Sequence, residues 1–371
     1  CPDDLKELVQ SLTKDKPTKM DKIKALYDFT VTNVRYLGLE FGASGYKPHK
    51  AMDVFRSRYG DCKDKATLLI TMLKEIGIPA DIVLIRTRDL GKVDYTIPSL
   101  GLFNHAIAHV PDVDGQEVWL DGTAMYCAIS EFPNGDQNRQ VFCINSTSGA
   151  FKTTTTFNAD HSVASYETEI QLAADGSASG KRNTQVSGSF APSMRYYFSN
   201  PAKIKQDVER QFNSQFPGTK IDEPEHSDLN DLNQSPHLSL TFTIPQMAAK
   251  VGNNLQISGN FFTTHMTDMY TRRSDRIHIM KLPFPWTRKI TTIYHLPEGC
   301  KVDYLPVSVD TELPFGRFSV KYTLTQNTLT YSEEIKVKAW EVATEDYTAF
   351  RSWCNLIDRK EDEKIFITPL K

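Results

Sequence analysis

The sequence predicts an α+β protein with a mixed first part and a β-rich second part. Up to about residue 150, helix-period apolar patterns alternate with short apolar strands, whereas short alternating segments separated by turn residues dominate beyond it. A chain of 371 residues has room for about two domains. We therefore expect one domain at 1–150 and a second, β-rich and sandwich-like, at 151–371, with one or two packed helices.

Three helices are predicted near the N-terminus. The first covers about 5–12, and the second starts at Thr18 and Asp21, which resemble a capping box. The third follows Cys62, because apolar residues recur there at helical spacing until Gly77 ends the pattern. The Cys62 thiol is therefore expected at or next to a helix N-terminus.

Three strands are predicted after this helix. Residues 80–86 are too apolar to be solvated on both faces, 105–110 form a second short strand, and 118–120 return from a turn at 112–115. This hairpin places His105 and Asp121 on neighbouring strands. The strand that returns from the turn runs antiparallel to the strand that carries the two histidines. Its last residues therefore lie near the first residues of that strand, which favours His105 over His109 as the neighbour of Asp121.

The second part contains repeated strand patterns and two helical segments. A polar run at 153–156 is the expected linker. The strand patterns lie at 166–172, 184–188, 238–244, 255–261, 289–294, 318–324 and 329–337. The helical segments lie at 201–216 and 345–356.

Composition excludes several classes of protein. The chain is 40% hydrophobic and 24% charged with a net charge of −3, so no basic excess indicates a nucleic-acid partner. No apolar run approaches the roughly 18 residues that a membrane-spanning helix needs. No cofactor is expected, and the sequence leaves the oligomeric state open. The absence of a CxxC pair among six cysteines argues against a zinc ribbon or a redox dithiol. Cys127 and Cys143 either form a loop disulfide or are small buried residues.

Cys62, His105 and Asp121 together suggest nucleophilic catalysis. A helix N-terminus favours the thiolate, which is the nucleophilic form of cysteine. His105 is then the candidate base and Asp121 the candidate group that orients it. His109 competes for the role of base because it leaves the same strand face. A zinc site is the other alternative, but four residues along a strand separate the two histidines by roughly 13 Å.

The pattern Gly60-Asp61-Cys62-x-x-x-Ala66, with His105 on a strand and Trp119-Leu120-Asp121 after it, resembles the transglutaminase-like superfamily. The resemblance implies a papain-like cysteine protease core in which Cys62 attacks a carbonyl carbon, His105 carries the proton and Asp121 holds His105. It also implies an oxyanion donor upstream, for which Tyr36 is the candidate, together with the backbone N–H of Cys62. Gly122 stands where many relatives have proline.

More narrowly, the chain resembles bacterial two-domain proteins in which this core precedes a β-rich domain of unknown function, with segments 296–300 and 304–306 similar to the second domain. Family members usually carry another β-rich domain before the core, so we expect a fragment or a shortened form. The resemblance implies a periplasmic or cell-envelope enzyme, although no export signal is in this sequence. Its expected substrates are peptides, proteins or glycan-peptides, with hydrolysis ranked above acyl transfer. The alternative is a non-catalytic binding or scaffold module of the cell envelope that retains the fold.

Overall fold

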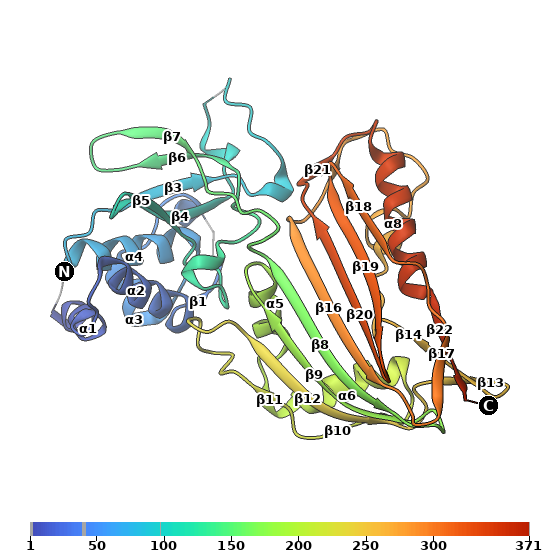
Figure 1. Cartoon of the computed structure of the whole chain (residues 1–371). Helices are drawn as coiled ribbons and strands as arrows, with labels where there is room; N and C mark the ends of the chain where they lie inside the picture. The colour runs from blue at the N-terminus through green and yellow to red at the C-terminus, as the bar shows by residue number, and fades with distance from the viewer. Residues whose placement is uncertain (1–2, 39–41, 97, 371) are drawn as a thin grey trace. The chain divides into compact units, whose positions relative to one another are not determined.

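The computed structural model describes residues 3–38, 42–96 and 98–370 (Figure 1). The chain divides into two compact units. The first consists of Cys1–Phe157 with Ala191–Ser193, and the second of Asn158–Phe190 with Met194–Lys371. Each unit has its own sheet and its own buried core.

Four helices form the helical layer of the first unit: α1 (Asp3–Thr13), α2 (Lys19–Asn33), α3 (Ala51–Ser57) and α4 (Cys62–Glu75). The capping box is confirmed, since Thr18 Oγ1 accepts from Asp21 N at 3.0 Å and Asp21 Oδ2 accepts from Thr18 N at 3.3 Å. Helix α4 contacts the other three helices and carries a fully buried apolar face, including Leu68 and Leu69. The short helix α3 was not predicted.

The sheet of the first unit has five antiparallel strands in the order β5-β4-β3-β6-β7. The strands are β3 (Asp81–Ile85), β4 (His105–Val113), β5 (Gln116–Leu120), β6 (Gln140–Ile144) and β7 (Gly149–Thr153). The predicted hairpin is confirmed: Asp114 and Gly115, at φ 54° and 87°, connect β4 to β5 and place Trp119 opposite His109. One face packs into a core around Val83 and Ile107, while α4 contacts β3 and β4 (Figure 1).

Strand β7 extends the first unit beyond residue 150, where the hydrophobic pattern of the sequence changes. It pairs with β6 along its whole length, so 149–153 belong to the sheet of the first unit. Thr154 is buried, accepts from Arg139 N and donates to Asp136 O, and is therefore tied into the first unit. The chain passes to the second unit between Phe157 and Asn158. The β6–β7 hairpin was not predicted.

Two sheets organise the second unit. The larger has nine strands: β8 (Val163–Leu172), β9 (Ala178–Val186), β10 (Lys220–Ile221), β11 (Glu225–His226), β12 (His237–Ile244), β16 (Trp286–His295), β18 (Val309–Leu313), β19 (Gly316–Thr325) and β20 (Thr328–Val337). It is antiparallel except where β8 runs parallel to β16. The smaller has four: β13 (Ala249–Val251), β14 (Asn254–Ser258), β17 (Cys300–Tyr304) and β22 (Lys364–Pro369). A two-stranded pair joins β15 (Met280–Lys281) to β21 (Glu341–Val342).

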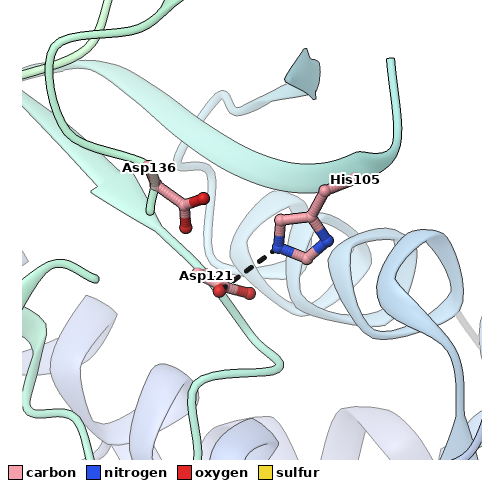
Figure 2. Close-up of side chains that lie close together, drawn as sticks. All are labelled: His105, Asp121 and Asp136. Atoms are coloured by element: carbon pink, nitrogen blue, oxygen red, sulfur yellow. Dashed lines mark ion pairs between the residues drawn. The ribbon is translucent and has the colours of Figure 1, made fainter. Parts of the chain in front are cut away.

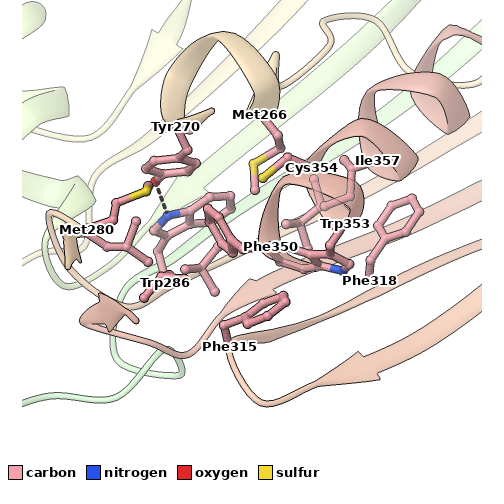
Figure 3. Packing of buried hydrophobic residues seen from close by; sticks show 14 of the residues in the cluster. Met266, Tyr270, Met280, Trp286, Phe315, Phe318, Phe350, Trp353, Cys354 and Ile357 are labelled. Carbon is pink, nitrogen blue, oxygen red and sulfur yellow. Dashed lines mark hydrogen bonds between the residues drawn. The ribbon is translucent and has the colours of Figure 1, made fainter. Parts of the chain in front are cut away.

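The helices of the second unit are α5 (Phe190–Tyr197), α6 (Ile204–Gln215), α7 (Met266–Tyr270) and α8 (Tyr347–Asp362). Helix α8 covers a face of the large sheet through Phe350, Trp353 and Ile357, which lie in one cluster with Phe318 (Figure 3). Aromatic side chains of 150–250 Å² supply most of the apolar area buried there. The β-rich second unit and its packed helices are therefore as predicted from the alternating segments.

A buried charged cluster lies within the second unit. Glu361 of α8 accepts from Thr264 N at 2.7 Å and lies 3.4 Å from the guanidinium of Arg288. Glu333 of β20 accepts from the Tyr331 hydroxyl. Burial, together with the nearby charge of Glu361, raises the pKa of Glu333 to about 8. This cluster was not predicted.

Cys127 and Cys143 are both buried and are not joined by a disulfide, so the alternative of small buried residues holds. Cys143 belongs to the apolar core of the first unit. Among the residues that the structure describes, no helix combines the length and the apolar character needed to cross a membrane.

Candidate active site

The sequence around Cys62 folds into a tightly fixed helix start. Asp61 is the N-cap of α4: its side chain accepts from Asp64 N at 3.2 Å, and the side chain of Asp64 accepts from Asp61 N at 3.2 Å. A Cβ on Gly60 would lie 2.7 Å from Cβ of Asp64, so only glycine fits the approach to this turn. Cys62 is thereby held in the first turn of α4, as predicted.

The charged residues that flank Cys62 fasten this turn to the neighbouring chain. Lys63 pairs with Asp61 at 2.5 Å, and Asp64 accepts from both N and Nδ1 of His49, at 2.7 and 3.0 Å. Lys65, only 1% exposed, donates to the carbonyl of Val34. Burial lowers the pKa of Lys65 to about 8, although the charge of Asp121 opposes this shift. The charged motif is thus mainly a scaffold for the position of the thiol.

His105 connects the thiol to a buried carboxylate. Its Nε2 lies 3.2 Å from Oδ2 of Asp121 (Figure 2). The Cys62 thiol is a hydrogen-bond partner of the same ring. Since Nε2 faces Asp121, Nδ1 is the ring nitrogen left for the thiol. The other oxygen of Asp121 accepts from N and Oγ1 of Thr123, at 2.8 and 2.7 Å. The structure therefore brings Cys62, His105 and Asp121 together.

Burial and pairing act in opposite directions on this site. Burial by itself lowers the pKa of His105, but the charge and hydrogen bond of Asp121 outweigh it and hold the pKa well above its usual range. Burial by itself raises the pKa of Asp121. The charge of His105 and the hydrogen bonds from His105 and Thr123 outweigh burial, so the pKa of Asp121 is lowered. An imidazolium beside a carboxylate is the favoured charge state.

His109 has different partners. Its ring is fully buried, its Nδ1 lies 3.3 Å from Oδ2 of Asp81 on the paired strand β3, and it stacks on Trp119 with ring centroids 4.2 Å apart. Burial lowers the pKa of His109, so the neutral ring is favoured there. The structure places His109 in the packing of the sheet and not among the residues that line the cavity at Cys62.

Asp136 is a neighbour of the site that the sequence reasoning missed. It lies in the loop between β5 and β6, is 2% exposed, and has a carboxylate oxygen within 4.8 Å of Asp121 and His105 (Figure 2). Burial and the charge of Asp121 raise its pKa well above the usual range. The run Pro133-Asn134-Gly135-Asp136 has the composition of an ordinary turn, so no local signal separates this aspartate from a solvated one.

Donor atoms of His105, Asp121 and Asp136 all lie within 4.8 Å of one another, the one such grouping found in the described part of the chain. A cation would have to displace the contact between Nε2 of His105 and Asp121. The arrangement fits the sharing of protons better than it fits a metal ion, and we assign no metal or cofactor to it.

Tyr36 and Gly122 occupy positions beside the site. Tyr36 lies in β1 (Arg35–Tyr36), which pairs in parallel with β2 (Tyr59–Gly60) and puts Tyr36 opposite Gly60. Its side chain is half exposed, and its role as an oxyanion donor stays a prediction. A Cβ on Gly122 would lie 3.2 Å from Cγ2 of Thr30, so the small residue lets the turn after Asp121 pack closely on α2.

A cavity of about 630 Å³ opens beside Cys62 and His105. Successive side chains of a strand point to opposite faces of the sheet. The strand residues in the cavity wall alternate with the buried core residues and present apolar surface to the cavity. This wall is formed by Ile82, Leu84, Ala106 and Ile144. Tyr46, Leu100 and Phe103 add further apolar surface, and Lys63 is the charged residue at the thiol end.

Two family models match the chain. The transglutaminase-like superfamily matches residues 6–123, and a domain of unknown function, DUF3858, matches residues 253–367. No curated protein matches the sequence.

Three solved chains are similar to this one, and two of them are described here. One is a candidate protease from Parabacteroides distasonis, with a TM-score of 0.59 and 16% identity; the match covers 98% of this chain and 55% of that protein. The other is a candidate cysteine protease from Cytophaga hutchinsonii, with a TM-score of 0.27, 22% identity, and coverage of 33% and 38%. This chain thus spans about half the length of the first of them. Residues 6–123 belong to the transglutaminase-like superfamily, and the β-rich unit after them contains the domain of unknown function.

Proposed function

We propose that this protein is a cysteine-nucleophile enzyme that cleaves amide or peptide bonds through an acyl-enzyme. The observation that carries the proposal is the chain of contacts from Cys62 to His105 and from His105 to Asp121. A nucleophile, a base and a group that orients the base are what this chemistry requires. The superfamily of the first unit supports the same class of reaction.

The proposed reaction has two halves. The thiolate of Cys62 attacks the substrate carbonyl carbon, and the His105 imidazolium gives its proton to the departing amine as the C–N bond breaks. A water molecule then attacks the thioester, His105 takes its proton, and the carboxylic acid leaves as the C–S bond breaks. Asp121 keeps the ring oriented and stabilises its charge throughout. Attack by an amine in place of water would make the same enzyme an acyltransferase, and we rank hydrolysis first.

The tetrahedral intermediate needs hydrogen-bond donors for its oxyanion. The backbone N–H of Cys62 lies in the first turn of α4, where N–H groups have no partner within the helix. Tyr36, beside Gly60, is the second donor that we propose.

The cavity beside Cys62 supports a substrate with a large apolar side chain next to the bond that is cleaved. Its wall of Ile82, Leu84 and Ile144 is apolar and partly exposed. Lys63, at the thiol end, is already paired with Asp61. A leucine- or phenylalanine-sized group would therefore gain more there than a charged group, which would lose its hydration without a free partner.

The proposal is tested by labelling and by turnover. A peptidyl electrophile with a bulky apolar side chain should label Cys62, and a panel of peptide amides and esters should reveal turnover that Cys62→Ser abolishes. A thiol that neither reacts nor turns over any member of the panel would favour the scaffold alternative. Reactivity that appears only after chelation would favour a zinc site.

The substrate class is tested separately. Leu84→Asp should lower kcat/KM at least tenfold for phenylalanyl and leucyl substrates, by the loss of about 1.5–3 kcal/mol of apolar contact. Leu90→Asp, which changes an exposed leucine of the same unit outside the cavity wall, is the matched control and should leave kcat/KM unchanged. Equal preference for charged and apolar side chains in the wild type would contradict the assignment of the cavity.

A further inference from the structure

We propose that Asp136 is a positioning residue of this site: as a neutral carboxylic acid, it donates a hydrogen bond to Asp121 and holds that carboxylate against the His105 ring. The inference rests on the proposed function, because it assigns Asp136 a part in the same site. Asp136 comes from a loop further along the chain, whereas Cys62 begins α4, His105 begins β4 and Asp121 directly follows β5.

The geometry places the two carboxyl groups close together and away from water. Asp121 and Asp136 are 5% and 2% exposed, and an oxygen of each lies within 4.8 Å of the other and of a nitrogen of His105. A hydrogen bond between two carboxyl groups needs one proton, because a carboxylate has no donor. Two buried carboxylates at this separation would also repel each other strongly. One of the pair must therefore be the acid.

The hydrogen-bond partners decide which one. Asp121 accepts from Nε2 of His105 and from N and Oγ1 of Thr123, so its negative charge is well satisfied. Oδ2 of Asp136 is buried without a hydrogen-bond partner in the structure. A carboxylate oxygen in that position would be an uncompensated buried charge, whereas an acid is tolerated. The proton therefore belongs to Asp136.

Two neighbouring charges favour an ionised Asp136, but burial and the charge of Asp121 outweigh them. They are His105 and the guanidinium of Arg139, which donates to the carbonyls of Arg86 and Gly91. The remaining neighbours act mainly on Asp121. They are Lys65 of α4, Tyr27 of α2 and, through His105, Cys62.

The loop that carries Asp136 is firmly held. Asp136 N donates to Pro133 O at 3.0 Å, and Asp136 O accepts from the buried hydroxyl of Thr154. Gln137 donates to the carbonyl of Phe132 at 2.7 Å. A carboxyl group fixed in this way restricts where Asp121 can lie, and an orienting residue acts only if its own position is fixed.

The test compares Asp136→Asn with Asp136→Leu. Asparagine is neutral and keeps a donor for Asp121, whereas leucine has similar bulk and no donor. The readouts are the downfield proton resonance of the His105–Asp121 hydrogen bond and the rate of alkylation of Cys62 by iodoacetamide. Asp136→Asn should keep the resonance and stay within about threefold of the wild-type rate. Asp136→Leu should lose the resonance and react at least about tenfold more slowly, as expected when a supporting hydrogen bond to a site ligand is removed.

Asp15→Asn is the matched control, because it removes an exposed acid of the same unit and should change neither readout. If Asp136→Leu does not fold, isotope-edited infrared spectra of the wild type and Asp136→Asn keep the proposal testable. With the label confined to aspartate, which leaves out the acid form of Glu333, the wild type should show one carboxylic acid carbonyl band at pH 7 that Asp136→Asn lacks. Its absence, or identical behaviour of the asparagine and leucine variants, would overturn the proposal.

None of these readouts needs a substrate. A protein that cleaves no peptide amide but shows the acid band and the rescue by asparagine would refute the proposed function and leave the role of Asp136 intact. An active protease without the acid band would support the proposed function and refute the role of Asp136.

Discussion

Nε2 of His105 lies 3.2 Å from Oδ2 of Asp121, across the pair of strands formed by β4 and β5. The strand hairpin brings these residues together, and Thr123 occupies the other oxygen of the carboxylate. The orientation of the ring is therefore set before any substrate binds. Four predictions follow from this arrangement and from the charged cluster of the second unit.

Cys62 should be the cysteine that iodoacetamide alkylates first at pH 6.5. It lies at a helix start, beside His105 and at the edge of a cavity, so a base is at hand and an electrophile can reach the sulfur. Burial instead raises the pKa of Cys143 to about 11 and of Cys354 to about 12, so both should be inert. Mass mapping after brief labelling measures the order. Faster labelling of Cys300, which is partly exposed, would contradict the prediction.

Asp121→Asn should leave the fold intact and lower the rate of turnover by about 10²- to 10⁴-fold. The amide can no longer stabilise an imidazolium, and it favours the wrong ring tautomer. His109→Ala is the comparison, since that ring packs on Trp119 and pairs with Asp81. It should reduce the free energy of unfolding by about 1–3 kcal/mol and leave the chemistry of Cys62 nearly unchanged. Equal losses of turnover in both variants would argue against the assignment of His105.

The pairing of His105 with Asp121 should stabilise the first unit most strongly in mildly acidic solution. The raised pKa of His105 means that its contribution is fully present below the unfolded value of about 6.5 and is lost as pH rises through the folded value. The lowered pKa of Asp121 means that its contribution is present above about 3.9 and is lost as pH falls through the folded value.

The difference in free energy of unfolding between the wild type and His105→Gln should therefore be largest between about pH 4 and pH 6.5. Urea titrations of the full chain, followed by a probe in the first unit, measure it. A difference that does not change with pH would show that the pair carries no charge in the folded protein.

Glu333→Gln should remove a pH dependence from the second unit. The pKa of Glu333 is raised to about 8, so between its usual value and pH 8 the folded protein binds a proton that the unfolded chain releases. The stability of the wild-type unit should fall across this range, by an amount on the order of 5 kcal/mol, whereas that of Glu333→Gln should fall much less. Glu334→Gln, on the same strand and less buried, is the control and should retain the wild-type slope.

Much of this site could be predicted from the sequence because its geometry is local. Gly60, Asp61 and Asp64 start a helix within five residues, so the chain itself puts Cys62 in the first turn. The Asp114-Gly115 turn sets the register of β4 and β5, and this register carries Asp121 toward His105. Strand alternation likewise indicated the β-rich second unit, since a period of two reports which face of a strand is buried.

Only the tertiary structure decided the rest, because long-range packing has no short sequence signal. Asp136 looks like part of a turn, and it becomes a neighbour of Asp121 only when Thr154, 18 residues further on, fixes its loop. His105 and His109 lie on the same strand. His109 contacts Asp81 and Trp119, whereas His105 contacts Cys62. The sequence by itself determined which residues can do chemistry and how each is held locally. Packing determined their surroundings, and the hydrogen-bond partners that it supplies favour the charge on Asp121 over the charge on Asp136.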